Sequence, residues 1–143
     1  MRRIQFTVLG KPEPQGSMKA FIAKGRGGAT VARVASDNAA MRPWRQQVGW
    51  EALRARAEAG MHEPWPQGIP IRLCCLFTFV KPKSASKLRL NPTVKPDLDK
   101  LQRAIGDALT GVLYTDDAQI IRLEVSKHYG APARAEIVVE ALP

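Results

Sequence analysis

The chain has 143 residues, of which 45% are hydrophobic, and this fits a single domain over residues 1–143 with a core of its own. No apolar stretch approaches the roughly 18 residues that span a bilayer, and no signal-peptide pattern opens the sequence, so a cytoplasmic protein without a membrane partner is expected. The 22 lysines and arginines outnumber the 13 aspartates and glutamates, and the formal net charge of +9 favours a polyanionic partner such as nucleic acid.

The first half of the chain predicts one strand and one long helix. Apolar and polar residues alternate over 4–9, which is typical of a strand, and the proline and glycine of 10–14 end it. A polar loop is expected next, in which the glycine-rich, basic stretch 24–28 is mobile. From 43 to 59 the apolar residues recur at helical spacing, and Gly60 is placed to end that helix.

The longest apolar run, residues 71–80, is rich in β-branched and aromatic residues and predicts a buried strand at the centre of the sheet. It contains both cysteines, Cys74 and Cys75. Because adjacent side chains on a strand point to opposite faces, these two thiols are not expected to pair with each other. They also lack the spaced partners of a zinc site, so we expect both to be small packing residues.

The second half predicts a further helix and two strands. Residues 98–109 carry apolar side chains at helical spacing, and Gly111 follows where a C-terminal cap belongs. Alternation over 121–126 predicts a strand, and a turn rich in glycine and proline leads to a last strand around 137–139, expected to form an antiparallel hairpin with it. The predicted fold class is therefore α+β, with a mixed or antiparallel sheet covered on one face by two helices.

Charge is unevenly distributed along the sequence. Residues 1–95 contain 17 basic and 5 acidic side chains, whereas residues 96–143 contain 5 basic and 8 acidic ones. The loop after the central strand contains no acid at all, and we predict that it binds DNA phosphates, with a solvated or disordered connector as the alternative. Its basic residues are Lys81, Lys83, Lys87, Arg89 and Lys95.

Four aspartates flank the predicted helix 98–109. Asp97 and Asp99 stand at its start, and Asp116 and Asp117 follow its end. Asp97 and Asp99 can face one site only if the backbone is still extended at Asp97, so the pair has to straddle the helix start. Carboxylates brought together in this way favour Mg²⁺, which takes hard oxygen ligands. The alternative is that these aspartates merely cap the helix, complement its dipole and form a turn.

Three motifs in this region resemble the RusA family of Holliday junction resolvases, the crossover junction endodeoxyribonucleases. They read KPDLDKLQRAIGDAL at 95–109, GVLY at 111–114 and DDAQI at 116–120. The segments at 8–12 and 14–19 are similar to the opening of phage and prophage members of that family.

The resemblance implies a homodimeric, Mg²⁺-dependent endonuclease, with Mn²⁺ as a substitute ion, that makes paired nicks across a four-way DNA junction. A two-fold dimer matches the approximate symmetry of an open junction. The family's essential acids fall on Asp97, Asp99 and Asp117, with Asp116 as a further metal-ligand candidate, and these carboxylates are expected to converge on one ion.

Two positions depart from the family pattern. Lys100 stands where an asparagine is common, and it joins the candidate DNA-binding residues, while Arg103 stands where the family has a catalytic-site lysine. Arginine neutralises phosphate but does not titrate near neutral pH. Activity should therefore survive if the family's lysine serves only electrostatics, and the rate should suffer if that lysine donates a proton. The alternative role of Arg103 is an ion pair with Asp99 or Asp107 along one helix stripe.

The sequence leaves three other functions open: a junction-binding relative without activity, a nuclease for flaps or other branched DNA, and a structural protein with a basic surface. Three aromatic residues are candidates for a wedge at the branch point. They are Tyr114, Trp65 and Phe21.

Overall fold

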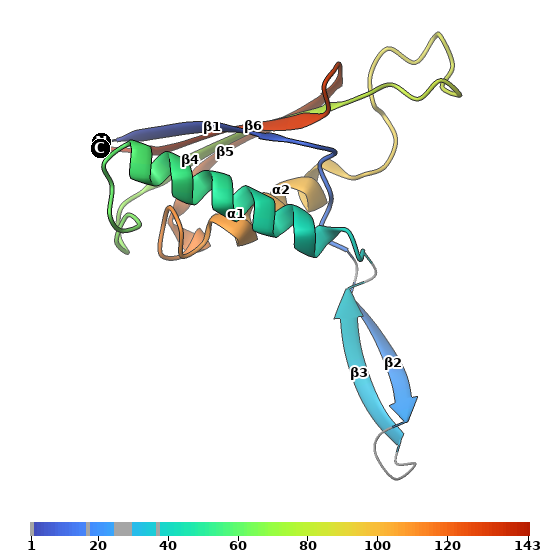
Figure 1. Cartoon of the computed structure of the whole chain (residues 1–143), viewed down its shortest axis with the longest axis horizontal. Coiled ribbons are helices and arrows are strands. Elements are labelled where there is room, and N and C mark those ends of the chain that lie inside the picture. Colours follow the sequence, from blue (N-terminus) through green and yellow to red (C-terminus); the bar gives the residue numbers. More distant parts are fainter. Residues whose placement is uncertain (1, 17, 25–29, 37) are drawn as a thin grey trace.

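The computed structural model describes residues 2–16, 18–24, 30–36 and 38–143, and its centre is a four-stranded sheet with both long helices on one face (Figure 1). The sheet has the order β1-β6-β4-β5. Its strands are β1 (Arg3–Leu9), β4 (Ile71–Phe79), β5 (Ile120–Tyr129) and β6 (Arg134–Ala141). The helices are α1 (Met41–Glu58), α2 (Leu98–Leu109) and the short 3-10 helix η2 (Asp117–Gln119).

Strand β4 lies inside the sheet, as its long apolar run predicts. It pairs in parallel with β5 and antiparallel with β6, which in turn pairs antiparallel with β1. Every second side chain of β4, from Ile71 to Phe79, is buried beneath the helices. The predicted α+β class with a mixed sheet covered on one face by two helices is thereby confirmed.

The predicted hairpin between the last two strands is wrong. Strands β5 and β6 run in opposite directions, but β4 lies between them. The four connecting residues, 130–133, reach about 13 Å when extended, and two strand spacings amount to about 10 Å. The short connection is thus long enough to pass one strand, and the apolar run of β4 gains a partner on each side.

The predicted polar loop after β1 is also wrong in part. Strands β2 (Met18–Lys24) and β3 (Thr30–Ser36) pair antiparallel as a two-stranded sheet of their own. In Figure 1 this hairpin stands away from the four-stranded sheet. The stretch 25–28, predicted to be mobile, lies outside the described residues.

The core fills the space between the sheet and the helices. Trp44, Val48 and Ala52 of α1 are buried, and the buried residues of α2 include Leu101 and Ile105. Fully burying one such large apolar side chain contributes about 1.5–3 kcal/mol, so this face anchors α2 firmly. The acidic residues of α2 lie on its opposite, polar side.

The ends of the two helices and the two cysteines agree with the predictions made from the sequence. Gly60 and Gly111 have φ angles of +75° and +83° and end α1 and α2. Cys75 is buried and Cys74 half-buried, both are unpaired, and burial raises the pKa of the Cys75 thiol. No helix within the described part of the chain has the length and apolar character to cross a membrane.

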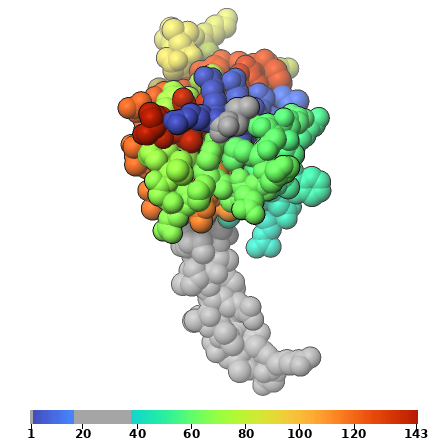
Figure 2. Space-filling model, turned by 90° about the vertical axis from the view of Figure 1, so that its left-hand side faces the viewer, coloured from blue at the N-terminus to red at the C-terminus, as the bar shows by residue number. Residues whose placement is uncertain are grey.

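The two ends of the described chain meet at one end of the sheet, where the backbone N–H of Ala141 donates to the carbonyl oxygen of Arg2 at 2.7 Å. Figure 2 looks onto this end and shows blue and dark red atoms side by side, with the yellow loop after β4 projecting above the body. In Figure 1 that loop leaves the opposite end of the sheet.

Candidate active site

Asp97 occupies the N-cap position of α2 with extended backbone angles, φ −69° and ψ 138°. Its carbonyl oxygen accepts the first helical hydrogen bond, from the N–H of Leu101 at 3.0 Å, but among the described residues its side chain caps no backbone N–H. Asp99 follows within the first turn, and both aspartates are exposed. The prediction that this pair straddles the helix start is confirmed, and capping does not account for the Asp97 carboxylate.

Asp116 has a structural role in the turn after α2. Its Oδ1 accepts from the N–H of Ala118 at 2.9 Å, and the side-chain oxygen of Gln119 accepts from the N–H of Asp116 at 2.9 Å, which forms a capping box. The amide nitrogen of the buried Gln119 donates to the carbonyl oxygens of Pro66 and Ile69. The turn is therefore fixed by Asp116 and Gln119, which leaves Asp117 exposed.

Asp117 lies beside the middle of α2. It lines a hollow of about 380 Å³ together with Arg103, Gly106 and Asp107 of the helix. Because an α-helix rises about 1.5 Å per residue, Arg103 is about 9 Å along the axis from Asp97. The carboxylates of Asp97 and Asp117 thus border different parts of the same helix.

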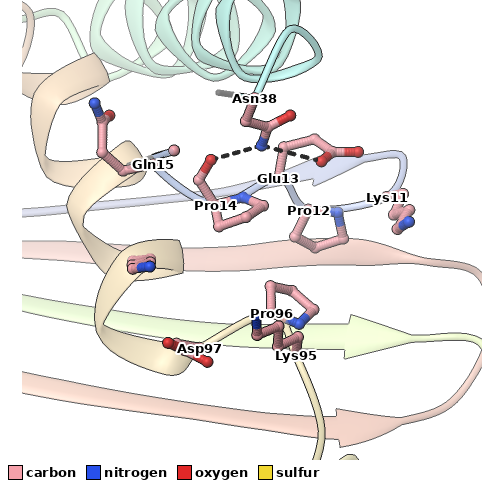
Figure 3. A pocket seen from close by; sticks show the side chains of 11 residues that line it. Lys11, Pro12, Glu13, Pro14, Gln15, Asn38, Lys95, Pro96 and Asp97 are labelled. Carbon is pink, nitrogen blue, oxygen red and sulfur yellow. Dashed lines mark hydrogen bonds between the residues drawn. The ribbon is translucent and has the colours of Figure 1, made fainter. Parts of the chain in front are cut away.

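Asp97 lines a larger hollow, of about 470 Å³, between the start of α2 and the segment 11–16 that follows β1 (Figure 3). Lys11, Lys95 and Lys100 also line it, so a carboxylate and several ammonium groups border one cavity. The backbone N–H of Gln15 donates to the carbonyl oxygen of Lys100 at 2.9 Å and ties this segment to the helix.

Asn38 fixes the far wall of the same hollow. Its amide nitrogen donates to the carbonyl oxygen of Pro14 at 2.8 Å and lies 3.5 Å from a carboxylate oxygen of Glu13, as the dashed lines in Figure 3 show. Glu13 and Lys11 were not predicted as site residues. They lie more than 80 residues before Asp97 in the sequence, and only the fold brings them to it.

The described residues contain no group of three or more histidine, cysteine, aspartate or glutamate side chains close enough together to hold a metal ion. The expected convergence of Asp97, Asp99 and Asp117 is therefore not present as a closed cage within one chain. Mg²⁺ in phosphoryl-transfer sites keeps several waters and takes only one or two carboxylates. The exposed aspartates, with hard oxygen donors, fit such a hydrated ion and not a fully dehydrated one.

Arg103 is exposed, and within the described part of the chain it forms no ion pair with Asp99 or Asp107 within 4.0 Å. The guanidinium faces the same hollow as Asp117. A positive charge beside an exposed carboxylate is suited to an incoming phosphate, and the alternative helix-stripe ion pair is not observed.

The comparison with known proteins identifies the family. Residues 11–140 match the family model described as endodeoxyribonuclease RusA. The chain belongs to the RusA family. A relative from Bacillus subtilis (strain 168), described as uncharacterized protein YqaN, is 32% identical over 140 residues, which cover 95% of this chain and 94% of the relative.

The basic residues of the loop in this RusA-family chain fall into three groups. Lys95 lines the hollow of Asp97, as does Lys100 on the helix. Lys81 and Arg89 instead approach the ring of Tyr129, each 6.0 Å from its centroid. The remaining two, Lys83 and Lys87, are exposed on the loop.

Lys127 on β5 was not predicted as a site residue, although it binds the backbone just before Asp97. Its ammonium group donates to the carbonyl oxygens of Val94 and Pro96, both at 2.8 Å. The available signal was a lysine on the helix-facing side of a strand, in step with Leu123 and Val125. In this RusA-family protein these two hydrogen bonds hold the backbone that leads to Asp97.

Two of the three candidates for a wedge at the branch point are buried. Tyr114 is fully buried, its hydroxyl donates to the carbonyl oxygen of Gly106 at 3.1 Å, and burial raises its pKa. Trp65 is 9% exposed, so neither ring can enter DNA without unfolding the core. The side chain of Phe21 lies outside the described residues. Trp50 on α1, which is 77% exposed, was not predicted as a wedge.

Proposed function

We propose that this RusA-family protein is a Mg²⁺-dependent endonuclease that resolves four-way DNA junctions by paired nicks, acting as a homodimer in recombination and repair. The observation that carries the proposal is the exposed Asp97 carboxylate, unused in capping, in a hollow bordered by Lys11, Lys95 and Lys100. Metal-assisted phosphodiester hydrolysis requires carboxylates that hold the metal ion and cationic side chains that bind the phosphates.

Each side chain has a distinct task in this proposal. Asp97, Asp99 and Asp117 would hold a hydrated divalent ion, at most two of them directly and the rest through the waters that Mg²⁺ keeps. When bound, the ion would polarise the phosphate and activate a water. Lys11, together with Lys95 and Lys100, binds the phosphates on either side of the cut. Arg103 neutralises charge that develops on the leaving oxygen, through the bidentate geometry that its guanidinium offers.

The homodimer follows from the geometry of the substrate. A four-way junction in its open form has approximate two-fold symmetry, and a two-fold dimer presents two equivalent sites to it. Because each site faces one of two opposed strands, the dimer can nick both strands without rearranging between the first cut and the second. Sedimentation of the protein at micromolar concentration, alone and with junction DNA, measures this directly.

The decisive experiment is cleavage of a synthetic four-way junction with each strand labelled in turn. The wild-type protein should nick two opposed strands with Mg²⁺ and none with a chelator. Asp97→Asn and Asp117→Asn should each slow cleavage by at least about 100-fold, because each removes charge that holds the ion. Glu63→Gln, at an exposed position in the loop after α1, is the matched control and should cleave normally.

Parallel reactions on a flap and on a linear duplex separate the competing functions. Equal rates on all three substrates would contradict junction selectivity. Junction binding without Mg²⁺-dependent nicking would identify a relative that binds but does not cut.

A further inference from the structure

A third hollow, of about 440 Å³, lies between the ends of β4 and β5 and the basic loop. Its walls are mostly apolar and include Phe79, Pro92, Val94 and Tyr129. We call it the base pocket. Its volume is within the range of small-molecule sites, and none of the functions assigned above uses its apolar interior.

The ring of Tyr129 is fixed in place before any ligand arrives. Its hydroxyl accepts a hydrogen bond from Nε of Arg89 at 3.0 Å, and the ammonium group of Lys81 lies 6.0 Å from the ring centroid. Lys127 holds the backbone on either side of Lys95 through the carbonyl oxygens of Val94 and Pro96. A wall ordered in this way loses little conformational entropy on binding a flat ligand.

The base pocket adjoins the hollow of Asp97. Lys11, Lys95 and Pro96 line both cavities. A phosphate bound by Lys11 and Lys95 would therefore stand between the two cavities, with the apolar interior on one side and Asp97 on the other. An apolar cavity with an aromatic wall and a cationic rim is complementary to a nucleotide, whose base has flat faces that stack on aromatic rings and whose phosphate is anionic.

We propose that the base pocket receives one unstacked DNA base from the branch point, next to the phosphate presented to Asp97. The inference rests on the proposed function and deepens it, because the base in the pocket would set any sequence preference at the cut. Bases at a branch point have lost a stacking neighbour, so extruding one costs less than in a continuous duplex. The base stacks against Tyr129, as unpaired bases do on aromatic side chains.

The test uses four-way junctions with 2-aminopurine at single positions around the branch point, in buffer without divalent ions so that the DNA stays intact. Emission from 2-aminopurine rises when the base leaves the stack. The wild-type protein should raise it at one position per strand. Val94→Trp should abolish the rise by filling the pocket, whereas Leu88→Trp, on a side chain that is 91% exposed in the same loop, should leave it unchanged.

Junction affinity gives a second readout. Tyr129→Leu should weaken binding by about 5- to 150-fold, the range expected for loss of one stacked base. Tyr129→Phe keeps the ring, and it should restore most of that affinity. Thermal unfolding of each variant identifies any that fails to fold.

The two proposals fail in different ways. Quenched 2-aminopurine at every position with bound wild-type protein, or an undiminished rise with folded Val94→Trp, would overturn the base pocket. An emission rise that Val94→Trp abolishes, together with no nicking by the wild type in Mg²⁺, would leave the pocket standing and overturn the nuclease.

Discussion

Arg103 stands where the family has a lysine, and its surroundings indicate what the arginine contributes. Its guanidinium shares a hollow with Asp117 and is exposed, with no ion pair to the acids on its own helix among the described residues. Because arginine stays protonated at every working pH, its contribution is electrostatic and not that of a proton donor.

We therefore predict that Arg103→Lys retains activity and that its rate has the same pH dependence as the wild type between pH 6 and 9. Arg103→Gln should lower the single-turnover rate by about 100- to 1000-fold, the usual cost of removing one group that stabilises transition-state charge. Cleavage rates of a labelled junction across that pH range measure both. A new fall in rate at high pH for Arg103→Lys alone would show that a proton is donated at this position.

We expect Lys127 to influence the site as a positioning residue, through the backbone that leads to Asp97. Replacing it with methionine leaves the carbonyl oxygens of Val94 and Pro96 without their donor, so Lys127→Met should lower the free energy of unfolding by about 1–2 kcal/mol. Urea denaturation measures this change, with Lys87→Met as a control at an exposed position of the loop. The same variant should need more Mg²⁺ for half-maximal cleavage, and an unchanged requirement would leave Lys127 a purely stabilising residue.

Among the residues, the motifs at 95–109 and 116–120 predicted Asp97, Asp99 and Asp117 as site residues, and that assignment stays a prediction. It did not identify Lys11 and Glu13, since their proximity to Asp97 depends on how the segment after β1 folds back onto α2. Two of the wedge candidates, Tyr114 and Trp65, are wrong for a related reason, because aromatic character alone does not distinguish a buried ring from an exposed one.

Helix α2 positions the acidic residues at and beside it, and the positive φ angle of Gly111 ends this helix. Gly111 has a φ of +83°, and a Cβ added there would meet nothing within 4 Å, so Gly111→Ala should cost about 1 kcal/mol through backbone strain alone. Gly49 lies inside α1, and an added methyl would make an ordinary contact with the carbonyl oxygen of Ala108 at 3.8 Å. Gly49→Ala should therefore stabilise by about 0.5–1 kcal/mol.

Urea midpoints of the two variants provide a matched comparison, because the same atoms are added at both glycines. A stabilising effect of Gly111→Ala would contradict the assignment of Gly111 as the residue that ends α2, and a destabilising effect of Gly49→Ala would contradict the prediction for α1.

Elements with a strong internal pattern were predicted well, and those defined by distant partners were not. Helices α1 and α2 and strands β1 and β4 follow from the spacing of their apolar residues. The β2–β3 hairpin was missed because its strands have little alternation and flank a glycine-rich stretch. The position of β4 between β5 and β6 depends on pairing across about 50 to 70 residues, which no local pattern encodes.

At the scale of the whole molecule, positive charge is concentrated on the loop after β4 and around the start of α2. Junction binding in the absence of divalent ions should weaken linearly on a plot of log Kd against log salt concentration. The double variant Lys83→Ala and Lys87→Ala should reduce that slope by up to about 2 units, one for each phosphate that the loop no longer binds.

Fluorescence anisotropy over a range of potassium chloride concentrations measures the slope. The double variant Arg42→Ala and Arg54→Ala removes the same charge from α1 and should leave the slope close to that of the wild type. If both double variants reduced it equally, binding would depend on net charge and not on the loop.

The hydrogen bond that joins Arg2 to Ala141 places both ends of the described chain at the far side of the sheet from the loop that binds DNA in our proposal. A linker attached at either end therefore emerges away from the junction arms. Immobilising the protein on a sensor surface, or labelling it with a dye for single-molecule work, should leave access to DNA unobstructed. Joining the two ends by a short peptide would also allow new termini to be opened elsewhere without rebuilding the site.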